Sequence, residues 1–102
     1  MRVLAAAVAA LAVLAGAAAA APIASLQDDA LVNVRGAALE ARLDALAATG
    51  ARVTRVDVLW REVAPTRPAD ARNPADPAYD WSRYDEIVRG LSARGISVIL
   101  DF

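Results

Sequence analysis

The sequence contains no cysteine, no histidine and no lysine, and each absence excludes a class of chemistry. Without cysteine the chain forms no disulfide, offers no thiolate nucleophile and builds no zinc site on cysteines. Without histidine it has no Ser-His-Asp triad and no imidazole metal ligand, and without lysine it has no Schiff base and no Walker lysine. We therefore predict no cofactor and no metal site in these 102 residues.

The charge of the chain is nearly balanced. Its 11 basic residues, all arginine, oppose 12 acidic ones, and the net charge is −1. A nucleic-acid-binding protein usually has a basic face. Because this chain has no basic excess, we predict no nucleic-acid partner.

Hydrophobic residues make up 58% of the chain and are concentrated at its start. Arg2 gives a short positive segment, residues 3–14 form an apolar run, and alanines at 17–21 offer cleavage sites before Pro22. This order is typical of a secretory signal peptide. We predict a signal peptide over residues 1–21, a secreted or extracytoplasmic protein, and no membrane contact after cleavage. The alternative is a retained membrane anchor, although no basic stop-transfer cluster follows the run.

Two helices are predicted from the spacing of apolar residues. Leu39, Leu43 and Leu46 lie at positions i, i+4 and i+7, which places them on one face of a helix over residues 37–48. Residues 82–94 show a similar apolar stripe and predict a second helix. Gly50 lies just past the end of the first segment and Gly95 just past the end of the second, as is typical of a left-handed C-terminal cap.

Three segments, at residues 31–34, 51–60 and 96–100, have the composition of strands. In residues 51–60 one face is mostly apolar and the other has Arg55 and Asp57, so we expect the charged face to lie toward solvent, a barrel interior or a cleft. The run at 96–100 is nearly all apolar, which is typical of a parallel strand buried on both faces. Strands that alternate with helices predict an α/β fold with a parallel sheet.

A long connection separates the second predicted strand from the second predicted helix. Residues 61–80 contain four of the five prolines, which predicts a loop without an interior strand or helix. Loops of about 20 residues are usually functional or disordered. We therefore expect this loop to line the rim of a functional site.

Four short motifs follow one another in the second half of the chain: G-A-R-V-T-R-V-D-V-L-W at 50–60, V-A-P at 63–65, Y-D-W-S-R-Y-D at 79–85 and G-I-S-V-I-L-D at 95–101. In order and spacing they resemble the start of the clan A (β/α)8 glycoside hydrolases, which include the cellulase-like family. The resemblance implies that residues 22–102 form the N-terminal portion of an incomplete (β/α)8 TIM barrel. This portion would hold roughly the first two to three β/α units and be truncated after the third strand.

The resemblance also implies a function. The full-length protein would be a secreted glycoside hydrolase that cleaves O-glycosidic bonds in a polysaccharide or oligosaccharide substrate. Its retaining mechanism would use two carboxylates about 5 Å apart. Both are expected beyond Phe102, so no residue of this chain is expected to be catalytic and the chain alone is expected to be inactive.

Four residues are candidates for active-site support or substrate binding. Arg55 matches by position the family arginine that keeps the nucleophilic carboxylate ionised, and the alternative is a structural ion pair with Asp57. Asp57 and Asp101 lie near the carboxyl ends of predicted strands, where barrels place their chemistry, but either is alternatively a structural carboxylate bonded to arginine. Trp60 offers a face for a sugar ring, although we favour packing between strand and helix for it.

A second function remains open at this point. Two or three parallel strands with two helices leave sheet edges without a partner. The alternative is therefore a small exported α/β module without enzymatic activity that completes its sheet by self-association.

Overall fold

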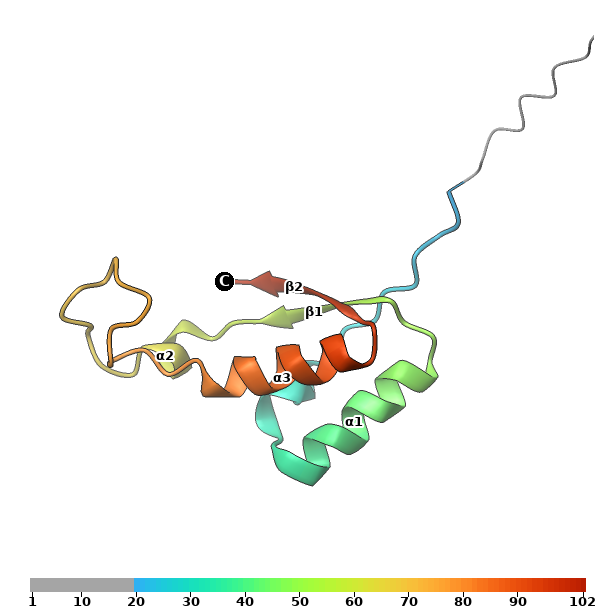
Figure 1. Cartoon of the computed structure of the whole chain (residues 1–102), viewed down its shortest axis with the longest axis horizontal. Helices are drawn as coiled ribbons and strands as arrows, with labels where there is room; N and C mark the ends of the chain where they lie inside the picture. Colours follow the sequence, from blue (N-terminus) through green and yellow to red (C-terminus); the bar gives the residue numbers. More distant parts are fainter. Residues whose placement is uncertain (1–19) are drawn as a thin grey trace, which may run out of the picture.

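The computed structural model of the chain describes residues 20–102. Its elements follow in the order η1 (Asp29–Asn33), α1 (Gly36–Ala48), β1 (Val53–Asp57), α2 (Trp60–Val63), α3 (Ser82–Ala93) and β2 (Ser97–Asp101), as Figure 1 shows. The predicted signal peptide lies almost wholly outside the described residues. In the part of the chain that the structure describes, no helix is long and apolar enough to cross a bilayer.

Strands β1 and β2 form a parallel sheet in which Val53 pairs with Ser97 and Asp57 with Asp101. Parallel neighbours need a crossover connection, and here α3 supplies it. Helix α3 packs against β2, and α1 packs against α3, so both helices lie on one side of the strands (Figure 1). Thr54 and Val56 of β1 face this side and are buried, whereas Arg55 on the other face is exposed. The predicted separation of an apolar and a charged face on this strand is confirmed.

Helices α1 and α3 agree with their predictions to within one residue at each end. Leu39, Leu43 and Leu46 of α1 are buried as the spacing predicted, and each buried leucine contributes about 1.5–3 kcal/mol to the hydrophobic stabilisation of the core. Gly50 and Gly95, which follow the two helices, have φ angles of 80° and 69°. Only glycine adopts this left-handed conformation without steric cost, so both chain reversals depend on it.

The predicted strand at residues 31–34 is wrong, because residues 31–33 lie in the 3-10 helix η1 and Val34 follows its end. Leu31 and Val32 are both buried, whereas adjacent residues of a strand point to opposite faces. Asp28 begins the turn by accepting a hydrogen bond from the backbone N–H of Ala30. The outer edge of β1 is instead contacted by the segment at residues 24–26, which forms a parallel bridge from Ser25 to Val53.

The predicted incomplete (β/α)8 barrel is contradicted. Residues 20–102 form three α-helices and a two-stranded parallel sheet, a small mixed α/β arrangement. A (β/α)8 barrel requires eight strands that close into a ring, whereas this sheet has two strands and one isolated bridge beside them. The prediction that both faces of β2 are buried is also wrong, because most of its residues are exposed, including Ile99 and Leu100.

Candidate functional site

Both strands end at the same edge of the sheet, and polar and aromatic side chains gather beyond it. Asp57 and Asp101 are the last residues of β1 and β2 and lie opposite each other in the register. Helix α2 begins three residues after β1, and the loop that follows it extends beyond this edge, at the left of Figure 1. The carboxyl ends of parallel strands are where α/β proteins commonly place their ligands.

A charged trio, formed by Arg55, Asp57 and Asp101, lies on the open face of the sheet. Arg55 Nε is 3.3 Å from Oδ1 of Asp57, and Arg55 Nη1 is 3.5 Å from Oδ2 of Asp101. All three side chains are about half exposed. Oδ1 of Asp57 is buried and forms no hydrogen bond among the described residues, so its contact with Arg55 is an ion pair without hydrogen-bond alignment. Exposed ion pairs of this kind contribute about 0–1 kcal/mol each to stability, so their main effect is to hold the three charged side chains close together.

Four aromatic rings form an aromatic surface at the same end of the sheet. The ring centroid of Trp60 lies 5.7 Å from that of Tyr79, 6.1 Å from that of Trp81 and 6.4 Å from that of Phe102. These distances and the tilted or edge-on angles are those of favourable aromatic pairs. Trp60 is nevertheless 53% exposed and Phe102 75% exposed. The rings thus support one another and leave apolar area in contact with solvent.

The loop between α2 and α3 is attached to this aromatic surface by the polar atoms of two of its rings. The hydroxyl of Tyr79 donates to the carbonyl of Ala71 over 3.0 Å, and Nε1 of Trp81 donates to the carbonyl of Pro74 over 3.3 Å. The N–H of Asp80 donates to the carbonyl of Val63 over 2.7 Å, which joins the end of the loop to α2. The rings are therefore held in place by backbone contacts as well as by one another.

Asp76 organises the interior of the loop. It is buried, and its carboxylate accepts hydrogen bonds of 2.9 Å from the backbone N–H groups of Asp70 and Ala78. These bonds, with that of Asp70 the strongest influence, lower the pKa of Asp76 below its ordinary value. The ionised form of Asp76 therefore makes the hydrogen bonds that hold the loop together, and protonation weakens them. The prediction of a loop without helix needs one correction, because its first residues belong to α2, which ends before Pro65.

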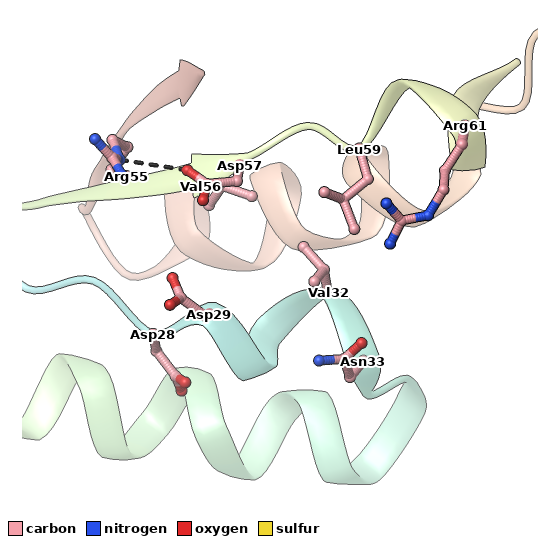
Figure 2. A pocket seen from close by; sticks show the side chains of 9 residues that line it. All are labelled: Asp28, Asp29, Val32, Asn33, Arg55, Val56, Asp57, Leu59 and Arg61. Atoms are coloured by element: carbon pink, nitrogen blue, oxygen red, sulfur yellow. Dashed lines mark ion pairs between the residues drawn. The ribbon is translucent and has the colours of Figure 1, made fainter. Parts of the chain in front are cut away.

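A cavity of about 330 Å³ lies between η1 and the end of β1; we call it the η1 cavity. Figure 2 shows Arg55 and Asp57 at one end and Arg61 and Asn33 at the other, with apolar side chains between them. Its full lining is Asp28, Asp29, Val32, Asn33, Arg55, Val56, Asp57, Leu59 and Arg61.

The structure brings three of the four predicted site residues together, since Arg55, Asp57 and Asp101 form the charged trio. The ion pair of Arg55 with Asp57, the structural alternative for this arginine, is present. Trp60 is the fourth, and the favoured prediction that it packs between strand and helix is wrong, because it begins α2 and is exposed. Glu62, another carboxylate near the end of β1, pairs with Arg83 over 2.9 Å.

The sequence prediction missed three of the four rings of the aromatic surface, Tyr79, Trp81 and Phe102. A signal was present, because Tyr79 and Trp81 lie two residues apart and Phe102 lies two residues after a predicted strand. Their meeting depends on the path of the loop, which the hydrogen bonds of Asp76 help to hold, and on the end of β2, which carries Phe102.

Comparisons with known proteins identify no relative of this chain, so its site is interpreted from its geometry alone. No model of a protein family matches the chain, and no curated protein or solved structure matches it. Among residues 20–102 no group of three or more carboxylates is placed to hold a metal ion.

Proposed function

We propose that the chain is part of a secreted glycoside hydrolase-like protein and that its aromatic surface binds the carbohydrate substrate. The observation that supports this most directly is the exposure of Trp60 within a group of four aromatic rings. The apolar leader supports export. No residue of this chain is assigned to either catalytic carboxylate, and the proposal concerns binding of the sugar chain.

The chemistry of the surface suits a sugar chain. A pyranose ring has faces of C–H groups that pack on aromatic rings, and its hydroxyl groups need hydrogen-bond partners at its edge. Trp60 and Phe102 offer exposed ring area. Asp101, directly before Phe102, offers carboxylate oxygens that accept from hydroxyl groups, and Arg55 beside it offers donors. Aromatic rings with a few polar groups are the usual lining of a ligand site.

Retention on polysaccharides tests the proposal. The chain, expressed with its leader in a secreting host, is run through native gels that contain cellulose derivatives, xylan, mannan or pectin. We expect at least one polysaccharide to retard it, and the Trp60→Ala variant to lose up to about tenfold in affinity, because one stacked aromatic ring contributes about 0.5–1.5 kcal/mol.

Ile23→Ala is the matched control, since Ile23 is an exposed apolar residue outside the aromatic surface. We expect this variant to bind as the parent does. Equal retardation of the Trp60→Ala and parent chains, or no retardation by any polysaccharide, would refute the proposal.

A second candidate function rests on the exposed strand β2. Its outer edge pairs with no other strand among residues 20–102, and Ile99 and Leu100 are exposed on it. An apolar edge of this kind is a template for pairing with a second copy of the chain. Sedimentation at several concentrations tests this. Ile99→Lys should convert an oligomer to a monomer, and a parent chain that is monomeric throughout would exclude self-association.

A further inference from the structure

The η1 cavity contains a basic group without a partner. Arg55 is paired with two carboxylates, and Asp28 is paired with Arg42 over 2.9 Å. Arg61 forms no ion pair within residues 20–102, and the side-chain amide of Asn33 forms no hydrogen bond there. Figure 2 shows Arg61 and Asn33 at the same end of the cavity, with the guanidinium of Arg61 extending toward its middle.

We propose that this cavity binds a sugar unit with a carboxylate group, a hexuronate, and that Arg61 pairs with that carboxylate. A guanidinium matches a carboxylate in a bidentate geometry, and charge-assisted hydrogen bonds of this kind are stronger than neutral ones. The amide of Asn33 adds a donor at the same end. The inference rests on the proposed carbohydrate-binding function and names the class of sugar.

The rest of the cavity suits a sugar ring. Val32 and Leu59 lie between the two polar ends and offer an apolar contact for the C–H face of the ring (Figure 2). Asp29 and Asp57 at the other end offer carboxylate oxygens that accept from hydroxyl groups. A volume of about 330 Å³ is at the small end of ligand pockets, which fits a single sugar unit better than a long chain.

Trp60 connects this cavity to the aromatic surface, because it lies between two cavity residues, Leu59 and Arg61, in the sequence. A uronate unit in the cavity and a neighbouring unit on Trp60 would belong to one acidic polysaccharide. The Arg61 end of the cavity therefore selects a sugar with a carboxylate, and the aromatic surface adds contact area.

Titration calorimetry with matched pairs of sugars tests the inference. The probes are glucuronate against glucose and galacturonate against galactose, followed by short oligouronates against the neutral oligomers. The variants are Arg61→Gln and, as a matched control, Arg67→Gln, which removes an exposed arginine of the loop that does not line the cavity.

We expect uronates to bind more tightly than their neutral counterparts, and Arg61→Gln to weaken uronate binding about tenfold while neutral sugars are unaffected. Arg67→Gln should change neither. Equal affinities for uronate and neutral sugars, or equal effects of the two arginine variants, would overturn the inference. If neutral oligosaccharides still bind in that case, only the inference fails, whereas loss of binding to every sugar would also refute the proposed function.

Discussion

The hydroxyl group of Tyr84 joins α3 to the junction between β1 and α2. Tyr84 is 4% exposed, and its oxygen accepts a hydrogen bond of 2.8 Å from the backbone N–H of Leu59. Leu59 directly precedes Trp60, so this bond fixes the point from which the exposed tryptophan extends. Replacing Tyr84 by phenylalanine keeps the ring in the core and removes only the acceptor.

The expected cost of Tyr84→Phe follows from the N–H group that it leaves without a partner. An unsatisfied buried donor costs about 1–3 kcal/mol. The bond is partly buried, so water replaces some of it, and we expect a loss of about 1–2 kcal/mol in the free energy of unfolding. In a domain of this size each 1 kcal/mol lowers the melting temperature by about 4–8 °C.

Tyr79→Phe is the matched control, because it also removes one phenolic hydroxyl group. The hydroxyl of Tyr79 bonds to Ala71 in an exposed part of the loop, so we expect a loss below about 0.5 kcal/mol. Urea unfolding followed by circular dichroism measures both variants, with an unchanged slope m as the sign that the unfolded states are comparable. Equal losses in the two variants, or a neutral Tyr84→Phe, would refute the account of this junction.

Two further predictions concern the helix packing and the loop. Gly90→Ala should destabilise the protein by about 1–2 kcal/mol despite the better helix propensity of alanine, because the added methyl group would overlap Cδ1 of buried Leu43. Ser92→Ala, at an exposed position of the same helix, is the control and should be neutral or slightly stabilising. A Gly90→Ala variant that melts at a higher temperature than Ser92→Ala would contradict this packing. For Asp76 the pKa is lower in the folded chain than its ordinary value of 3.8, so its contribution to stability is complete above about pH 4 and is lost as the pH falls through the folded pKa. Asp76→Asn should therefore flatten the loss of stability as the pH falls below about 4 in urea titrations, and an unchanged acid profile would exclude this role.

The helices were predictable from the sequence because their signals are local. Leu39, Leu43 and Leu46 define one face of α1, and Gly50 marks its end, whatever the rest of the chain does. The segment at 31–34 has the composition of a strand, but the hydrogen bond from Ala30 to the carboxylate of Asp28 favours a tight turn. A local polar contact thus overrode the apolar pattern.

The features that the sequence did not predict depend on contacts between distant segments. The apolar composition of β2 indicates that it prefers burial, but whether anything covers Ile99 is a property of the assembled fold. In the same way, the charged trio forms because the register places Asp101 beside β1, and no local pattern contains that register. The exposure of Trp60 follows from the start of α2, which ends the alternation of β1 before it reaches this residue.

Tryptophan fluorescence tests the central claim most directly, because the chain has two tryptophans and both, Trp60 and Trp81, belong to the aromatic surface. Titration with oligosaccharides, neutral and uronate-containing, should shift and saturate the emission of the parent chain. The Trp60→Ala variant should retain the emission of Trp81 and need about tenfold more oligosaccharide for the same fractional change. An emission spectrum of the parent chain that no oligosaccharide changes would contradict the account.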